Sequence, residues 1–188
     1  MRIIGGDFRG RALASVGKGD KGAHLRPTTD RVRESLFNVL MGGRFGDPIS
    51  DARVLDLFAG TGALGLEALS RGATHVTFVD DGHKANALIR QNIALCRAEA
   101  ETTLIRRDVR KLPPCTFDPF SLVFLDPPYG KALGEKAIAS ALAEGWIAPD
   151  ALIVWEESAD ITPPIGMTTI DCRRYGDTNI SLLQVDPL

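Results

Sequence analysis

From residue 52 onward, short apolar runs alternate with longer stretches in which apolar residues recur every three or four positions. The apolar runs have the length of buried strands and lie at residues 54–58, 75–79, 102–105, 122–125 and 152–155. The stretches between them predict helices at residues 63–69, 84–96 and 133–142. Strands that alternate with helices favour a parallel sheet covered by helices on both faces, which is an α/β fold.

The carboxyl-terminal part departs from this alternation. Residues 167–175 and 179–185 are two β-rich runs, and Gly176 and Asp177 separate them. So short a connection leaves no room for a crossover helix and predicts an antiparallel hairpin. The hairpin closes an otherwise parallel sheet, which then has seven strands.

The amino-terminal part predicts a small β-hairpin followed by a helix. Residues 2–13 have the pattern of two short extended pieces around glycine turns. A helix is expected to begin at residues 28–30, because Thr and Asp side chains accept hydrogen bonds from the first free amides of a helix. Apolar residues at helical spacing between positions 32 and 40 give this helix one buried face. Arg31 and Arg33 are expected elsewhere on its surface.

Charge is distributed unevenly along the chain. Residues 1–44 carry nine Lys and Arg against four Asp and Glu, whereas residues 45–188 carry thirteen Lys and Arg against twenty Asp and Glu. The net charge of the whole chain is −2. A basic segment is where a polyanion binds. We therefore divide the chain into an RNA-binding extension at residues 1–44 and an enzyme domain at residues 45–188. The arginines expected to contact phosphate are Arg9, Arg11, Arg26 and Arg31.

Composition excludes several other classes of protein. Hydrophobic residues make up 44% and charged residues 24% of the chain, values typical of a globular domain and not of disordered or fibrous proteins. Cys96, Cys115 and Cys172 are far apart and the histidines have no ligand spacing, so we expect reduced thiols and no metal site. No apolar run approaches the roughly 20 residues that span a bilayer. We expect a cytoplasmic protein.

The strand at residues 54–58 leads directly into a glycine turn and a helix. Gly60, Gly62 and Gly65 satisfy the G-x-G-x-x-G spacing of dinucleotide-binding proteins. Asp56 favours another ligand, because a buried carboxylate is costly unless a cation meets it. The ammonium group of S-adenosylmethionine is such a cation, whereas a pyrophosphate would be repelled. The turn therefore predicts S-adenosylmethionine as the cofactor.

Acidic residues after the next two strands predict the other cofactor contacts. Asp80 or its neighbour Asp81 is expected to accept hydrogen bonds from the ribose hydroxyls. Asp108 is expected to accept from the adenine amino group, and a turn or helix cap is its structural alternative. The predicted cofactor-binding residues are Asp56, Phe58, Ala59, Gly60, Thr61, Gly62, Asp80, Asp81, Asp108 and Val109.

The fourth predicted strand ends in Asp126, Pro127, Pro128 and Tyr129. This is the carboxyl end of a strand, where ligands bind in open α/β sheets. If Asp126 and the Pro127 carbonyl accept both hydrogens of an aromatic amine, the nitrogen lone pair turns toward the sulfonium methyl group. Tyr129 supplies a flat surface on which a base can stack. These four residues predict catalysis of methyl transfer to an exocyclic amine of a nucleobase.

The motifs together resemble the RsmD family of bacterial small-subunit ribosomal RNA methyltransferases. The similarity extends over nearly the whole length of the chain, with similar segments at residues 2–6, 26–38, 60–73, 126–129 and 175–178. The resemblance implies a class I S-adenosylmethionine-dependent methyltransferase fold with a small amino-terminal extension. It also implies methylation of a guanine N2 amine in 16S rRNA, with the small ribosomal subunit or an assembly intermediate as partner. A monomer is expected.

Four alternatives stay open from the sequence. A DNA adenine-N6 methyltransferase would use the same four residues, but about forty amino-terminal residues are little material for reading a major groove. A protein glutamine methyltransferase usually has Asn in place of Asp126. A nicotinamide-dependent oxidoreductase leaves Asp56 unexplained. A non-catalytic RNA-binding module would not explain why every expected catalytic position carries the residue type that the reaction requires.

Overall fold

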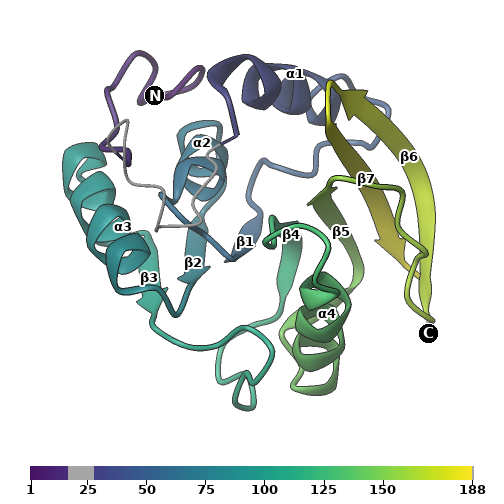
Figure 1. Cartoon of the computed structure of the whole chain (residues 1–188). Coiled ribbons are helices and arrows are strands. Elements are labelled where there is room, and N and C mark those ends of the chain that lie inside the picture. Colours follow the sequence, from purple (N-terminus) through teal and green to yellow (C-terminus); the bar gives the residue numbers. More distant parts are fainter. Residues whose placement is uncertain (17–27, 188) are drawn as a thin grey trace.

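The computed structural model describes residues 1–16 and 28–187, and this part of the chain contains a seven-stranded sheet with helices on both faces (Figure 1). The strands are β1 (Arg53–Leu57), β2 (His75–Val79), β3 (Thr102–Ile105), β4 (Phe120–Leu125), β5 (Ile147–Glu157), β6 (Met167–Tyr175) and β7 (Thr178–Val185). The helices are α1 (Asp30–Leu40), α2 (Ala63–Ser70), α3 (His83–Cys96) and α4 (Leu133–Ala143). No helix in the described ranges is both long and apolar enough to cross a membrane.

The strand order is β3-β2-β1-β4-β5-β7-β6. Strands β1 to β5 pair in parallel, and β7 is antiparallel to both β5 and β6. The predicted α/β fold and its antiparallel hairpin are therefore confirmed. Strand β5 begins five residues before the predicted run, because Ile147 pairs with Phe120 across a register shift that precedes the Leu122–Leu152 pair.

Alternate residues of the central strands face two separate cores, as the period of a strand requires. Val54 and Phe124 belong to the core that α1, α2 and α3 cover. Leu55 and Val123 belong to the core that α4 covers on the other face. The helices therefore hold the central strands β1 and β4 on both sides, with the carboxyl ends of these strands fixed next to each other (Figure 1).

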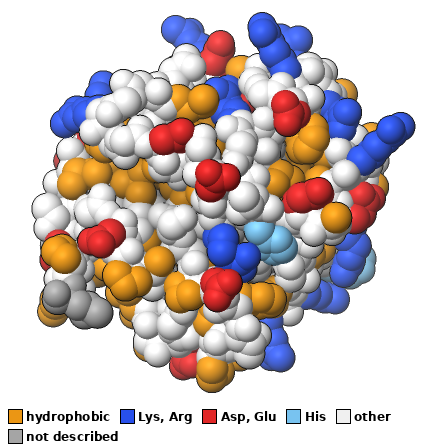
Figure 2. All heavy atoms as spheres, turned by 180° about the vertical axis from the view of Figure 1, so that it is seen from behind, with side chains coloured by type: hydrophobic (Ala, Val, Ile, Leu, Met, Phe, Trp, Pro, Cys, Tyr) orange, Lys and Arg blue, Asp and Glu red, His pale blue; other side chains and the backbone are white. Residues whose placement is uncertain are grey.

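The charge imbalance along the sequence does not produce a surface of one sign on every face. Figure 2 shows the side of the molecule behind that of Figure 1, where basic and acidic side chains are mixed with apolar ones. On this face the basic side chains are scattered and do not gather into one continuous patch (Figure 2).

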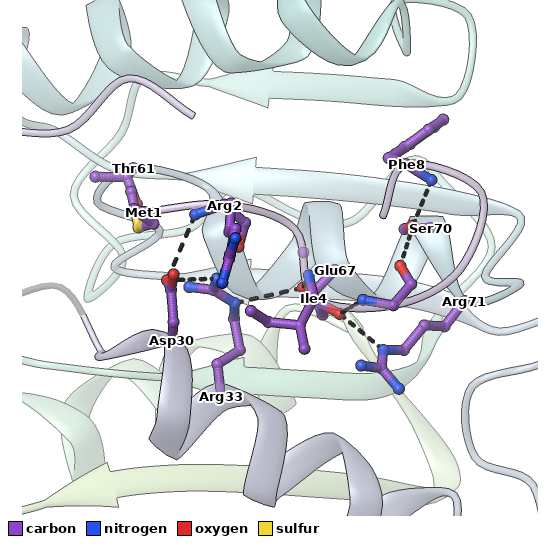
Figure 3. Close-up of polar contacts among 12 residues, drawn as sticks. Met1, Arg2, Ile4, Phe8, Asp30, Arg33, Thr61, Glu67, Ser70 and Arg71 are labelled. Atoms are coloured by element: carbon purple, nitrogen blue, oxygen red, sulfur yellow. Dashed lines mark hydrogen bonds and ion pairs between the residues drawn. The ribbon is translucent and has the colours of Figure 1, made fainter. Parts of the chain in front are cut away.

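The predicted amino-terminal hairpin consists of one isolated bridge, between Arg2 and Ala12, and no strand. Backbone hydrogen bonds join Ile3 to Arg11 and Leu13 to Met1 across the hairpin, and the residues of its turn bond to α2. The amides of Ile4 and Gly5 donate to the Glu67 carboxylate at 2.8 Å each. This carboxylate holds the turn of the hairpin against α2 (Figure 3).

Arg33 was expected on the helix surface, and that expectation is wrong. Its side chain is fully buried, with Nε 3.4 Å from Glu67 Oε2 and Nη2 3.0 Å from Asp30 Oδ1 (Figure 3). The guanidinium also donates to the Arg2 carbonyl. Position 33 lies on the same helical stripe as the buried residues 36, 37 and 40.

The apolar cores do not separate at the predicted domain boundary. Ile3 and Leu13 from the amino-terminal segment and Phe37 from α1 share one core with Val54 of β1. The division at residue 44 stays a prediction.

Candidate active site

A cavity of about 680 Å³ opens at the carboxyl ends of the parallel strands. Its volume lies in the range of small-molecule sites, and its residues follow β1, β2, β3 and β4, with Thr28 from the segment before α1. The order β2-β1-β4-β5 reverses direction between β1 and β4, which is where ligands bind in such sheets. Apart from Gly62, the lining includes every predicted cofactor-binding residue and all four predicted catalytic residues.

The glycine turn after β1 allows close packing beneath the cavity. Gly62 begins α2 with a left-handed φ of 76°. A Cβ atom on Gly65 would lie 2.5 Å from the Phe78 ring and 2.6 Å from a Val76 methyl group. Only glycine therefore lets α2 approach β2 this closely, which brings the first turn of the helix against the cavity floor.

Asp56 is buried, with a side chain that is 2% exposed, and it lines the cavity. Its Oδ2 accepts a hydrogen bond from the Gly65 amide at 3.0 Å. Burial, with a smaller contribution from the nearby charge of Asp80, raises the pKa of the Asp56 carboxyl to about 8, although the hydrogen bond from the Gly65 amide lowers it in part. A cation in the cavity would favour the ionised carboxylate. Asp56 is thus suited to a positively charged ligand.

Asp80 and Asp81 both line the cavity but differ in how they are held. Asp80 is half-buried, and its two carboxylate oxygens accept from the amides of Gly60 at 3.0 Å and Gly82 at 2.8 Å. Burial raises the pKa of Asp80, and these two amides counter part of the rise. Asp81 is exposed. The fixed orientation favours Asp80 as the residue that meets a ribose.

Asp108 lines the cavity and also stabilises its own turn. Its carboxylate accepts from the Arg110 side chain at 2.8 and 2.6 Å and from the Arg110 amide at 3.0 Å. The hydrogen bond from Arg110 holds the pKa of Asp108 below its usual value. The residue therefore has the turn role that was its structural alternative, and its contact with an adenine stays a prediction.

The predicted catalytic residues form the wall that follows β4. Asp126 is half-buried, and its amide donates to the Leu57 carbonyl at 3.5 Å. Tyr129 lines the same cavity, and its hydroxyl donates to Glu156 Oε1 at 2.7 Å and lies 3.2 Å from Thr178 Oγ1. Burial raises the pKa of Tyr129 above its usual value. The tyrosine is therefore a neutral ring held at its far end.

Sequence reasoning missed the residues that hold Tyr129. Glu156 is the first residue after the predicted strand at residues 152–155, so its position at the carboxyl end of β5 was the available signal. Thr28 and Thr178 lie in segments that carry the family resemblance but were given no role. Thr28 Oγ1 donates to Glu156 Oε2 at 2.8 Å.

The arginines selected for RNA contact lie at different distances from the cavity. Arg9 is exposed, and Arg11 donates to the Cys96 carbonyl at 2.8 Å, at the end of α3. Arg11 therefore lies about 20 Å from the cavity residue His83 at the start of this 14-residue helix, but Asn92, one turn before Cys96, donates to the carbonyl of the cavity residue Thr61 at 2.8 Å. Arg31 is exposed and follows Thr28 by three residues. Arg26 lies outside the described residues.

Basic side chains that the sequence analysis did not select border the cavity. These are Lys84, Arg110 and Lys131. No group of three or more metal-ligating side chains occurs within residues 1–16 and 28–187. The charged surroundings of the cavity therefore come from its own carboxylates and from these three cations.

Known proteins of one family resemble this chain over most of its length. A family model described as "Conserved hypothetical protein 95" matches residues 1–184. Ribosomal RNA small subunit methyltransferase D of Escherichia coli (strain K12) is 39% identical over 160 residues, which cover 85% of this chain and 76% of that protein. The protein of the same name from Haemophilus influenzae is 41% identical over 169 residues, which cover 87% and 83%.

The fold agrees with the sequence comparison. A solved structure from Escherichia coli has a TM-score of 0.81 and 35% identity, and the match covers 100% of this chain and 99% of that one. The chain therefore belongs to the RsmD family, which the matching model describes as conserved hypothetical protein 95, and it is a methyltransferase.

Proposed function

We propose that this enzyme transfers a methyl group from S-adenosylmethionine to the exocyclic N2 amine of a guanine in 16S rRNA. One observation carries the proposal: Asp56 near the end of β1, Asp80 after β2 and Asp108 after β3 line the same cavity as Asp126, Pro127, Pro128 and Tyr129 after β4. The names of the Escherichia coli and Haemophilus influenzae relatives supply the substrate class, small-subunit ribosomal RNA.

The cavity residues fit a cationic nucleoside cofactor. Asp56 is a buried carboxylate that only a cation keeps ionised at neutral pH, and the ammonium group of S-adenosylmethionine is such a cation. Asp80 holds two oxygens in a fixed orientation for the ribose hydroxyls. Asp108 and Val109 border the space for adenine. When bound, the cofactor supplies an activated methyl group on a sulfonium centre.

The chain's own residues prepare the amine. The amine is a poor nucleophile because its lone pair is delocalised into the guanine ring. The Asp126 carboxylate and the Pro127 carbonyl accept its two hydrogens, which localises the lone pair and directs it toward the methyl group. Asp126 then takes the proton that the methylated nitrogen releases. Tyr129 stacks on the base and keeps it in the plane that this attack requires.

The proposed RNA partner is part of the small ribosomal subunit or of an assembly intermediate. We also propose that the enzyme is cytoplasmic and that it is a monomer. The proposed phosphate contacts are Arg9, Arg11, Arg26 and Arg31. Among the described arginines, the position of Arg31 next to Thr28 at the cavity supports its role most directly. Arg9 and Arg11 would contact RNA that extends along α3.

Methyl transfer to three nucleic acids tests this function. Purified enzyme is incubated with labelled S-adenosylmethionine and with small subunits from cells that lack the modification, free 16S rRNA or DNA. Digestion to nucleosides and mass spectrometry then identify the product. We expect N2-methylguanosine from the small-subunit sample. N6-methyladenine from DNA would establish the alternative function, and an unmodified guanine in all RNA samples would contradict the proposal.

The buried carboxyl of Asp56 predicts cofactor binding that depends on pH. Its pKa of about 8 means that a cationic cofactor has to displace a proton at lower pH. Affinity should therefore rise between pH 6 and 7.5, by up to about tenfold per pH unit. Above this range the ligand's own ammonium group begins to lose its proton.

Calorimetric titrations in buffers of different ionisation enthalpy measure both the affinity and the proton released. The Asp56→Asn variant is the matched control, because its side chain still accepts from the Gly65 amide but cannot ionise. It should bind the cofactor more weakly and without this pH dependence. Equal proton release by both proteins would show that Asp56 does not meet the ammonium group.

A further inference from the structure

The hydroxyl of Tyr129 is already engaged by two side chains. It donates to Glu156 Oε1 at 2.7 Å and lies 3.2 Å from Thr178 Oγ1, which can donate to it. Its bonding capacity is thereby filled, because a phenolic hydroxyl has one proton to give. The hydroxyl is therefore not the group that meets the substrate, and the ring is what Tyr129 presents to the cavity.

Glu156 is the central member of this arrangement. Its side chain is buried, with 7% of the residue exposed, and it accepts from Tyr129 and from Thr28, the latter at 2.8 Å. Within residues 1–16 and 28–187, no lysine or arginine forms a salt bridge with it. Its polar partners are therefore hydroxyl groups, which is an unusual environment for a buried carboxylate.

The four residues come from four separate parts of the chain. Thr28 precedes α1, Tyr129 follows β4, Glu156 lies near the end of β5 and Thr178 begins β7. We call this set the tyrosine anchor. Because a phenolic hydroxyl bonds close to the plane of its ring, one partner that accepts and another that donates limit both the direction of the side chain and the rotation of the ring.

We propose that Glu156 is a positioning residue for methyl transfer, which holds the Tyr129 ring at the angle on which the target base stacks. The proposal rests on the proposed function, in which the target base stacks on Tyr129 and Asp126 accepts a hydrogen from its amine. It adds a residue outside the cavity lining to the machinery of the reaction. It also explains why the segment before α1 and the carboxyl-terminal hairpin meet at the site.

A double-mutant cycle tests the anchor through the reaction. Glu156→Ala and Tyr129→Phe should each lower kcat about 10- to 100-fold, because the ring loses its fixed orientation. Cofactor affinity should not change, and the Michaelis constant for RNA should change little because phosphate contacts dominate RNA binding. The double variant should be no worse than the poorer single variant. If the losses in kcat of the two single variants multiply in the double variant, Glu156 and Tyr129 act independently, and this result would overturn the proposal.

Two further variants separate positioning from a structural effect. Glu156→Gln keeps an oxygen that accepts from Tyr129 and should retain most of the activity that Glu156→Ala loses. Glu157→Ala changes the next residue of β5, which bonds to Ser158 and not to the anchor, and should leave kcat unchanged. Equal losses in Glu156→Gln and Glu156→Ala would show that orientation of the ring is not what Glu156 provides.

A readout without substrate keeps the anchor testable if the proposed function fails. The protein has two tyrosines, so Tyr175→Phe leaves Tyr129 as the single tyrosine signal in a protein labelled at the tyrosine ring carbon that bears oxygen. We expect Glu156→Ala to shift this NMR signal and Glu157→Ala to leave it in place. An unshifted signal in folded Glu156→Ala would refute the anchor. Absent methyl transfer by the unmodified enzyme would refute only the proposed function.

Discussion

Replacing Asp126 with alanine is expected to lower kcat by about 10³-fold or more, while S-adenosylmethionine binds within a few-fold of its normal affinity. The reason is the place of Asp126 at the end of β4 in the cavity wall. In the proposed function it meets the amine, whereas Asp56, Asp80 and Asp108 hold the cofactor. Removing Asp126 takes away both the acceptor that localises the lone pair and the acceptor of the released proton.

Single-turnover methyl transfer to small subunits and calorimetric cofactor binding measure the two halves of this prediction. Asp126→Asn is the informative companion, since its amide oxygen still accepts one hydrogen from the amine but cannot take the proton. Its activity should lie between those of the alanine variant and the unmodified enzyme. Turnover close to normal in Asp126→Ala would discredit the catalytic assignment, and a collapse of cofactor binding would move Asp126 to the cofactor site.

The largest effect on stability is expected from Glu67→Ala, which should lower the free energy of unfolding by about 3 to 5 kcal/mol. Glu67 is fully buried and interacts with Arg33 at 3.4 Å and with Arg71 at 2.8 Å. It also accepts from the amides of Ile4 and Gly5 (Figure 3). Its loss leaves the buried Arg33 guanidinium with only the half-exposed Asp30 as a carboxylate partner, and it leaves two backbone donors without an acceptor.

Thermal and urea unfolding measure this change. A loss of that size should lower Tm by about 10 °C in a domain of this length. Glu34→Ala removes an exposed carboxylate from α1 and should change Tm little. Adding Arg33→Met to Glu67→Ala should restore part of the stability, because the unpaired charge is then gone. A Glu67→Ala protein as stable as the Glu34→Ala control would mean that the buried network contributes nothing.

The fold was largely predictable because its signal is local. The strand runs at residues 75–79 and 102–105 and the glycine turn between β1 and α2 follow from hydrophobic period and spacing within about ten residues. The end of each parallel strand then fixes which residues share an edge of the sheet. That is why Asp56, Asp80 and Asp126 could be selected together before any coordinates were known.

Long-range polar partners were not predictable in the same way. Arg33 was placed on the surface because it is charged, although its spacing from Leu36, Phe37 and Leu40 puts it on the buried stripe. Glu156 finds Thr28 across 128 positions of the chain, and hydrophobic period contains no information about such a pair. A charged residue at a position that the helical or strand period marks as buried is the signal that would have revealed both.

The amino-terminal segment shows the same limit of local pattern. Residues 2–13 pair as a short hairpin, but local pattern did not indicate that Glu67 and Ser70 of α2 accept from the backbone amides of its turn. These side chains satisfy amides that have no partner within the hairpin. The outcome depends on tertiary contacts more than sixty positions apart.

The central claim is that one cavity holds the cofactor with its sulfur facing Asp126, which accepts a hydrogen bond from the guanine amine. A crystal structure with bound S-adenosylhomocysteine tests it most directly. We expect the amino group of the ligand beside Asp56, its ribose hydroxyls on Asp80 and its sulfur directed at the space between Asp126 and Tyr129. A ligand bound outside this cavity, or bound with its sulfur turned away from Asp126, would contradict the account.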